Sequence, residues 1–240
     1  MQFSSRWPSL PDACDLLVLA AHPVELAPLR SLWAGAPAGP CGGLRLGTAA
    51  VGVGMWASAA GTAAVLHGCS ASAALLVGSY GYLPQRQGAL LELLIPGDCL
   101  LLDRGVLRGE GALPDSVATR IELDQALSAG LWQVAPQALR GSLGTSLAIT
   151  TSSAAARELA VAASDCRGEN LEVLAVAQAS GACGVPLAAV MVATNEVGEQ
   201  GRSQWLAHHR TAAQHAAAVV QAYCEAGAPG LRCGSAAVSS

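Results

Sequence analysis

The sequence predicts a single α/β domain with a central mixed, partly parallel sheet flanked by helices. The chain of 240 residues is 52% hydrophobic and 12% charged, which is enough apolar material for one substantial core. Apolar runs of strand length alternate with helical segments, and no internal repeat or linker divides them. We expect an N-terminal extension over 1–14, the domain over 15–226, and a disordered tail over 227–240.

The first half of the chain supplies three expected strand regions and two helices. The apolar run 16–21 is expected to be a strand, and Pro23 is well tolerated in the first turn of the helix that follows. A second strand region, 44–54, ends in glycines and leads into a helix over 55–68. A third strand is expected over 72–78, closed by a turn at the residues SYGY.

The second half continues the alternation. A strand is expected over 99–104 and a helix near 122–139, within a less regular stretch. The segment 142–153 supplies a strand and then a helix start, where Ser152 or Ser153 can act as the N-cap. The remaining expected elements are a helix over 171–183, a strand over 185–195 and a long helix over 203–226.

Composition excludes several classes of function. Lysine is absent, which removes P-loop and Schiff-base chemistry. The net charge of −4 and the absence of a basic run argue against nucleic acid as a partner. The long uncharged stretches are rich in Ala, Gly, Ser and Val and are broken by turn signals, so we expect buried α/β elements and no membrane partner. The N-terminus lacks an apolar segment of signal-peptide length, and we expect a cytoplasmic protein.

The cysteine and histidine spacing predicts neither a metal site nor a disulfide framework. The eight cysteines contain no CxxC pair, and we interpret them as small buried hydrophobic residues. His208 and His209 are adjacent and therefore point to different faces of a helix. We expect no metal and no organic cofactor.

The segment GVGMWA, 52–57, fits the pattern G-x-G-x-x-A between a strand and a helix. A dinucleotide site also needs an acidic residue about twenty positions later, to bind the ribose hydroxyls. Between Glu25 and Glu92 the chain contains no Asp or Glu. A dinucleotide-binding oxidoreductase is therefore a weak alternative, although these glycines can still let the backbone approach an anion, a ribose or a water.

Polar residues follow the apolar strands at their carboxyl ends, where open α/β sheets bind ligands. Glu25 follows the strand 16–21, Ser79 follows 72–78, and Asn195 follows 187–194. Glu25 can also be a solvated residue of a first helical turn, and Ser79 and Asn195 can be simple turn residues. Glu172 is harder to dismiss, because a carboxylate that opens an uncharged segment needs a partner if it is buried.

Six segments resemble the nucleoside phosphorylase/nucleosidase superfamily in their order and spacing. They are VLAAHPVELAPL, VGVGMWASAAGTAAVL, LLVGSYGYLPQ, IPGDCLL, GENLEVLAVAQASGACGVPLAAV and VATNEVG. The closing segment TNEVGEQGRSQW is most similar to the futalosine hydrolase branch, which acts in menaquinone biosynthesis. The resemblance covers about residues 15–225 and implies a nucleoside phosphorylase-like fold, a small-molecule purine nucleoside as partner and a homo-oligomer, for which helix 55–68 is a candidate interface.

The resemblance also implies roles for individual residues. Glu172 would accept hydrogen bonds from the ribose hydroxyls, and Glu25 would deprotonate the attacking water. Ser79 would hold that water, and Asn195 would bind the purine, where an amide suits a 6-oxopurine better than adenine. The implied catalytic residues are Glu25 and Asn195, and the implied substrate-binding residues are Ser79, Tyr80, Gly81, Thr151, Leu171 and Glu172.

The chain departs from the family pattern in ways that matter for the reaction. Met191 replaces a common arginine that donates to the catalytic water, and Leu171 replaces a methionine. Tyr80 and Tyr82 stand where small residues are usual, and they join Trp205 as candidates for stacking on the base. Phosphorolysis is disfavoured, because the strand before Ser79 lacks arginine, although Arg45 could reach a site. A methylthioadenosine/S-adenosylhomocysteine-type nucleosidase and a catalytically weak nucleoside-binding relative are the alternatives.

Overall fold

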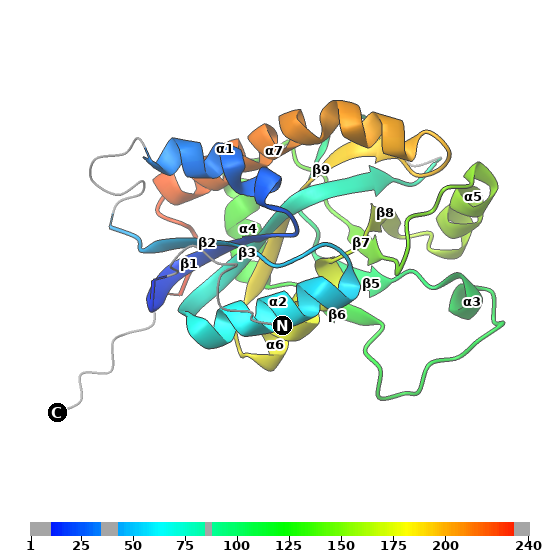
Figure 1. The fold of residues 1–240 in the computed structure, drawn as a ribbon, viewed down its shortest axis with the longest axis horizontal. Coiled ribbons are helices and arrows are strands. Elements are labelled where there is room, and N and C mark those ends of the chain that lie inside the picture. The colour runs from blue at the N-terminus through cyan, green and yellow to red at the C-terminus, as the bar shows by residue number, and fades with distance from the viewer. Residues whose placement is uncertain (1–10, 35–42, 85–87, 233–240) are drawn as a thin grey trace, which may run out of the picture.

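The sheet is built around one long strand, β3 (Ser70–Tyr82), in the computed structural model, which describes residues 11–34, 43–84 and 88–232. β1 (Ala13–Ala20) runs parallel to the first part of β3 on one edge. β9 (Leu187–Glu196) runs parallel to β3 on the other edge, as far as the end of β3. These three strands form the centre of the fold (Figure 1).

The remaining strands extend this centre on its outer edges. β2 (Leu46–Ala50) is parallel to β1, and β4 (Leu93–Leu94) is antiparallel to β9. Beyond the far end of β3, the sheet continues through β8 (Cys166–Asn170), β7 (Ser142–Thr145), β5 (Asp98–Leu101) and β6 (Arg120–Glu122). The sheet is therefore mixed and partly parallel, as the sequence predicts.

β1 and β8 share one edge of β3 and meet at their carboxyl ends. β1 pairs with β3 as far as Val77, whereas β8 runs antiparallel and pairs with Gly81 and Tyr82. The edge of β3 between these pairings, 78–80, is left open by both strands. Because side chains that follow β1 and β8 are directed to the same gap, this junction is where a ligand site is expected.

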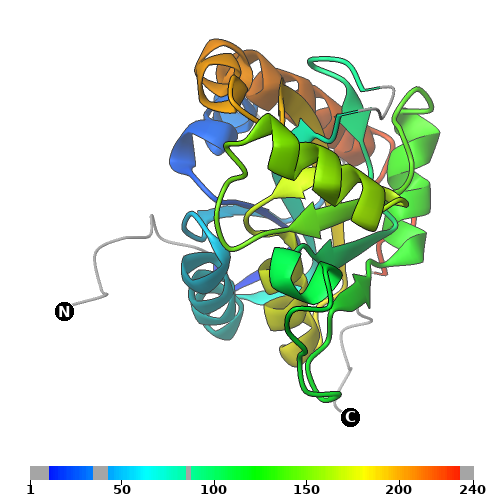
Figure 2. The ribbon, with the colours of Figure 1, turned by 90° about the vertical axis from the view of Figure 1, so that its right-hand side faces the viewer.

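Helices cover both faces of the sheet and divide the core. α1 (Pro23–Ala34), α4 (Gln125–Val134) and α7 (Gly201–Glu225) pack on one face, and α2 (Met55–Gly68) and α6 (Val173–Ala182) on the other (Figure 1). Side chains of β1 alternate between the two: Leu16 and Val18 face the first layer, and Leu17 and Leu19 the second. α3 (Arg104–Leu107) and α5 (Ser153–Ala162) lie at the end of the molecule that faces the viewer in Figure 2.

Most expected elements are confirmed, with shifted ends. α1 begins at Pro23, and Ser152 is the N-cap of α5, accepting from the amide of Ala155 at 3.4 Å. The expected strand 44–54 is shorter, and that over 99–104 ends at Leu101, before Asp103 caps α3. The helix expected over 122–139 is shorter in the structure: it is α4, and its N-cap is Asp124.

Two expectations about strands were wrong. The residues SYGY do not form a turn after 78, because β3 continues through Tyr82 alongside β9, with a bulge between Tyr80 and Gly81. β8 was not expected at all. Its sequence, CRGEN, carries charges and glycine, and it becomes a strand only because β3 and β7 pair with it.

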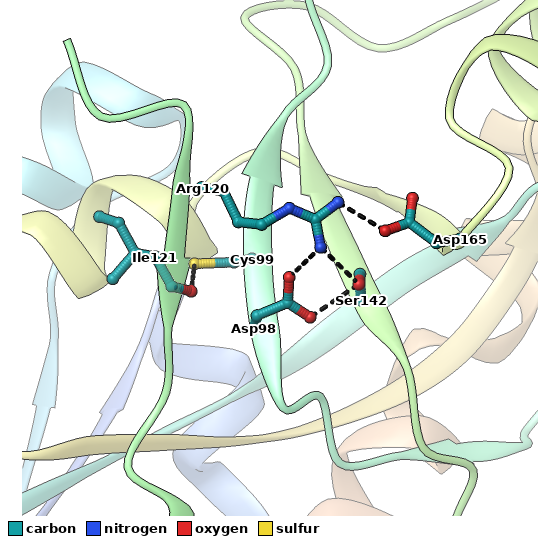
Figure 3. A network of polar contacts seen from close by, with 6 residues as sticks. All are labelled: Asp98, Cys99, Arg120, Ile121, Ser142 and Asp165. Carbon is teal, nitrogen blue, oxygen red and sulfur yellow. Dashed lines mark hydrogen bonds and ion pairs between the residues drawn. The ribbon is translucent and has the colours of Figure 1, made fainter.

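An arginine holds the strands of the β8 half together (Figure 3). Arg120 of β6 pairs with Asp98 of β5, and it donates to Ser142 of β7 at 3.1 Å. Its other terminal nitrogen donates to Asp165, just before β8, at 2.6 Å. Ser142 in turn donates to Asp98 at 2.7 Å. One side chain therefore links β5, β6, β7 and the start of β8.

The expected domain boundaries, 15 and 226, lie close to the start of the first strand and the end of the last helix. β1 begins at Ala13, and residues 1–10 of the expected extension lie outside the described residues. In the expected tail, Ala228 is buried and Tyr223 donates to the carbonyl of Pro229 at 2.9 Å. Residues 233–240 lie outside the described residues.

The expectation that the cysteines are small buried residues is matched in part within the described residues, since Cys183 is exposed. Five of the described cysteines are buried, as expected of small apolar residues: Cys14, Cys69, Cys99, Cys166 and Cys224. Across the described ranges, no helix combines the length and apolar character that crossing a membrane requires. The same residues contain no group of three or more metal-ligating side chains arranged to hold an ion.

Candidate active site

A cavity of about 480 Å³ opens where β1 and β8 meet. Its wall comes from the segments after β1 and β8, the end of β3, the loop 149–151, the end of β9 and the start of α7. All eight residues proposed from the sequence line this one cavity: Glu25, Ser79, Tyr80, Gly81, Thr151, Leu171, Glu172 and Asn195.

Glu172 is held by the glycine loop that precedes α2. It is 7% exposed, and its Oε1 accepts a hydrogen bond from the amide of Gly54 at 2.8 Å. Gly52 and Gly54 have φ of +105° and +85°, which only glycine adopts readily, and the loop therefore turns this amide toward the carboxylate. Burial raises the pKa of Glu172, and the hydrogen bond from Gly54 opposes the increase.

The same hydrogen bond argues against a dinucleotide-binding role for the glycine loop. The anion that the GVG loop binds is a carboxylate of this chain, at the N-terminus of α2, where the helix dipole favours negative charge. The amide that a dinucleotide phosphate would need is already engaged by Glu172. The loop therefore serves as a support for this side chain.

Asn170, which the sequence reasoning missed, places Glu172. Its Oδ1 accepts from the amides of Glu172 and Val173, at 2.7 and 2.8 Å, and so stabilises the first turn of α6. Its Nδ2 donates to the carbonyl of Ser79 at 2.9 Å, which ties the end of β8 to the open edge of β3. An asparagine three residues before an uninterrupted apolar helix is a capping signal that could have identified it.

Glu169, also missed, fixes the loop that forms one wall of the cavity. Its carboxylate accepts from the hydroxyl of Ser146 at 2.8 Å and from the amide and hydroxyl of Thr150, at 3.0 and 2.7 Å. This loop brings Ile149 and Thr151 to the cavity. Nothing in the sequence identifies these partners, because they come together only when β7 and β8 pair.

Glu25 projects from the first turn of α1. Its Oε2 accepts from the amide of His22 at 2.9 Å. Its Oε1 lies beside Gly78, where an added Cβ would be 3.5 Å from this oxygen and 3.3 Å from the methyl group of Met191. Burial raises the pKa of Glu25 to about 7; the hydrogen bond from His22 opposes this, and the negative charge of Glu172 adds to it. A carboxylate with a pKa near neutrality can act as a general base.

The residues at the end of β3 have separate environments. The hydroxyl of Ser79 accepts from the indole N–H of Trp205 at 3.2 Å. The ring of Tyr80 is 3% exposed and packs in the core against Gly168, and its burial raises the pKa of the phenol. Tyr82 packs against Gly88. The rings of Tyr80 and Tyr82 are thus engaged in packing, and of the three stacking candidates Tyr80 and Trp205 line the cavity.

Asn195 occupies the next-to-last position of β9, beside Gly81 and Gly201. A Cβ at Gly81 would lie 2.6 Å from its Nδ2, and one at Gly201 would lie 3.2 Å away. Its Oδ1 accepts from the hydroxyl of Thr194 at 2.9 Å, and its Nδ2 donates to the carbonyl of Glu196 at 3.0 Å. The second hydrogen of Nδ2 has no bond to the described residues, and it can be donated to a ligand.

The first turns of α7 bring a basic and aromatic row to the cavity, which the sequence reasoning did not identify as a unit. The guanidinium of Arg202 lies 5.0 Å from the ring centre of Trp205. The ring of His209 stacks on the same indole, with centroids 4.5 Å apart. The three residues line the cavity, and their spacing of three and four positions places them on one face of the helix.

The charges of the cavity are mainly negative. Its carboxylates are Glu25, Glu169, Glu172 and Glu199, whereas Arg202 is the one arginine among the described residues that line it. Arg45, which the sequence left as a possible phosphate ligand, is paired with Asp15 at 2.7 Å near the start of β1 and does not line the cavity.

The fold is shared with solved nucleosidases. The structure of a 5′-methylthioadenosine/S-adenosylhomocysteine nucleosidase from Neisseria meningitidis superposes with a TM-score of 0.78 over 90% of this chain and 100% of that one, at 19% identity. An S-adenosylhomocysteine nucleosidase from Streptococcus pyogenes gives 0.78 over 90% and 98%, at 18% identity. A futalosine hydrolase from Helicobacter pylori gives 0.76 over 88% and 98%, at 18% identity.

The predicted nucleoside phosphorylase-like fold is thereby confirmed. No protein-family model matches the sequence, and no curated protein matches it either. At identities below 20% the structural likeness concerns the fold, and the function has to be inferred from the site itself.

Proposed function

We propose that this chain is an N-glycosyl hydrolase that cleaves the bond between a purine and ribose. The observation that carries the proposal is a pair of carboxylates, the half-buried Glu25 and the buried Glu172, at the meeting point of β1 and β8. Two carboxylates in one cavity suit a reaction whose transition state is a positively charged oxocarbenium ion. The shared fold with solved nucleosidases supports it.

The roles follow from the surroundings of each side chain. Glu172 has one oxygen engaged by Gly54 and accepts the ribose hydroxyls with its other lone pairs. Glu25 takes a proton from water while the water oxygen attacks C1′ and the bond from C1′ to the purine breaks. The purine leaves with the bonding electrons, and the free N–H of Asn195 stabilises the negative charge that develops on it.

Hydrolysis is favoured over phosphorolysis by the charge of the cavity. A phosphate dianion would face the carboxylates of Glu25, Glu169 and Glu172, and only Arg202 is an arginine among the described lining residues. A neutral water molecule is not repelled by these carboxylates. Arg45, which the sequence offered as a possible phosphate ligand, lies away from the cavity, and Arg86, the other candidate, lies outside the described residues.

The finer proposal is that the nucleoside is futalosine, released as hypoxanthine and dehypoxanthinyl futalosine by a cytoplasmic homo-oligomer in menaquinone biosynthesis. Asn195 supports a 6-oxopurine, because the free N–H of its amide can donate to an acceptor of such a base, N7 or O6. The alternative of a catalytically weak nucleoside-binding protein has one observation in its favour. Met191 and the carboxylate of Glu25 both lie next to Gly78, and the apolar methionine cannot donate a hydrogen bond to orient a water.

The test is a phosphate-free assay of base release with futalosine, inosine and methylthioadenosine. We expect hypoxanthine from futalosine. Glu25→Gln should abolish turnover while it leaves binding largely intact, and Glu172→Gln should weaken binding. Adenine released from methylthioadenosine would overturn the substrate assignment, and normal turnover by Glu25→Gln would overturn the assignment of the base.

A further inference from the structure

Trp205 lines the cavity and donates its indole N–H to Ser79, a contact that has no role in the reaction as described so far. Resting on the proposed hydrolysis, we propose that Trp205 is a positioning residue, which holds the hydroxyl of Ser79 so that this group donates its proton to the attacking water. The role differs from stacking on the purine, for which the sequence made Trp205 a candidate. It also supplies the hydrogen-bond donor that the apolar Met191 does not provide.

The ring of Trp205 is already in contact with two neighbours on α7. Arg202 comes from the turn before it, and its guanidinium lies 5.0 Å from the centre of the ring. His209 comes from the turn after it, and its imidazole stacks on the indole with centroids 4.5 Å apart. Because positions three before and four after a helical residue lie on either side of it, the indole is held between these groups. The edge of the ring, with its N–H, is therefore the part that serves the site.

The chemistry of the two groups determines the direction of their hydrogen bond. An indole nitrogen can only donate, so the oxygen of Ser79, at 3.2 Å from Nε1 of Trp205, is the acceptor. The hydroxyl keeps its own proton, and within the described part of the chain this proton has no acceptor. Because Ser79 lines the cavity, the proton is available to a water there. A hydroxyl that accepts one hydrogen bond also becomes a stronger donor of the next.

Ser79 adjoins the carboxylate that takes the proton from water in the proposed reaction. Glu25 approaches the residue before it, since a Cβ added at Gly78 would be 3.5 Å from Oε1 of Glu25. Both Gly78 and Ser79 belong to the edge of β3 that β1 and β8 leave open. A water in this gap donates a proton to Glu25, accepts a hydrogen bond from Ser79 with one lone pair, and attacks C1′ with the other.

Two contacts from different elements fix Ser79. Nδ2 of Asn170 donates to its carbonyl at 2.9 Å, which holds the backbone in place. Trp205 holds the hydroxyl, which would otherwise turn among the three staggered rotamers of χ1. Loss of the indole N–H therefore frees the direction of the hydroxyl and leaves the strand where it is. The water is then held less often in the geometry that attack requires.

The experiment measures base release from futalosine, inosine and methylthioadenosine in phosphate-free buffer, for Trp205→Phe, Ser79→Ala and the double variant. Phenylalanine keeps a ring between Arg202 and His209 but has no N–H. We expect Trp205→Phe to lower kcat by about tenfold or more and to change KM by less than about twofold, because the interaction acts on the water. The double variant should be no slower than Ser79→Ala, because the indole acts through the Ser79 hydroxyl.

Trp33→Phe is the matched control. Trp33 also donates its indole N–H to a side chain, that of Gln221 at 2.9 Å, but it is not among the residues that line the cavity. The control should leave kcat unchanged. By NMR of isotopically labelled protein, Ser79→Ala should shift the indole N–H resonance of Trp205 and leave that of Trp33 in place. This second measurement tests the hydrogen bond with Trp205 present, and an unshifted resonance would overturn the role.

The kinetic outcomes separate the positioning role from the proposed function. Base release by the unmodified chain, with an unchanged kcat in Trp205→Phe, would overturn the positioning role and leave the hydrolase proposal standing. A raised KM at unchanged kcat would do the same, since it indicates stacking on the nucleoside. So would a double variant in which the effects of the two substitutions multiply. If the unmodified chain releases no base, the hydrolase proposal is overturned, and the positioning role with it.

Discussion

Glu25, the proposed general base, has a cost in stability. Its pKa of about 7 in the folded chain compares with an ordinary value of 4.5. Between these values, the folded chain binds a proton that the unfolded chain releases, so the free energy of unfolding falls as the pH rises from 4.5 to 7. The penalty is complete above pH 7, where the carboxylate is ionised and able to accept a proton from water.

We predict two measurable effects of this pKa. The kcat/KM for base release should rise with pH and level off above about 7. At pH 8, Glu25→Gln should raise the free energy of unfolding by on the order of 1–3 kcal/mol. The melting temperature should rise by about 2–10 °C. At pH 4 the same substitution should have almost no effect. A gain in melting temperature that is equal at both pH values would contradict the assignment.

Gly81 is the second position where one residue decides the geometry of the site. A methyl group there would lie 2.6 Å from Nδ2 of Asn195, and the amide would have to move. We predict that Gly81→Ala lowers kcat by about tenfold or more, because a displaced donor stabilises the leaving purine poorly. Gly97→Ala, where nothing lies within 4 Å of the added methyl, is the control. Equal activity of the two variants would remove Asn195 from the mechanism.

At the level of elements, the Arg120 network is expected to hold β8 in place (Figure 3). The guanidinium is half exposed, so each ion pair is screened by solvent. We predict that Arg120→Met lowers stability by about 1 kcal/mol, or about 2–4 °C in melting temperature. Arg104→Met, which removes the bond to Glu158 from an exposed arginine outside the sheet, should cost less. A larger loss in the Arg104 variant would show that the network contributes little.

The elements also show what the sequence can predict. Helices and central strands were predictable, because their apolar periods are long: β1 is buried on both faces, and α6 is almost uniformly apolar. β8 was not, since its charged residues are stabilised by pairing with β3 and β7 and by contacts with a distant loop. The proposed site residues came from strand ends and from a resemblance. Glu169 required the tertiary structure, because its partners Ser146 and Thr150 lie about twenty residues away, whereas Asn170 carried a capping signal that the sequence reasoning missed.

At the scale of the whole molecule, an apolar surface borders the site. Trp56 of α2 is 74% exposed, and Val53 and Ile149, which line the cavity, are also exposed. We predict that copies of the chain associate through this surface. Light scattering should give a multiple of 24.1 kDa for the unmodified chain and a lower mass for Trp56→Glu. Val161→Glu, at an equally exposed position on α5, is the control. A monomeric unmodified chain would contradict the prediction.

The meeting of β1 and β8 on one edge of β3 has a consequence for motion. β8 joins β3 through two residue pairs, at Gly81 and Tyr82, whereas β1 joins it through seven. The two carboxylates therefore follow the strands on either side of a seam where only two residue pairs join β8 to β3, and such a short pairing favours local opening. In hydrogen–deuterium exchange, the amides of 166–170 should exchange faster than those of β1 in the empty protein. A nucleoside bound to both Glu25 and Glu172 would link the two sides of this seam and reduce its opening. Amide exchange in β8 should therefore become slower when the nucleoside binds.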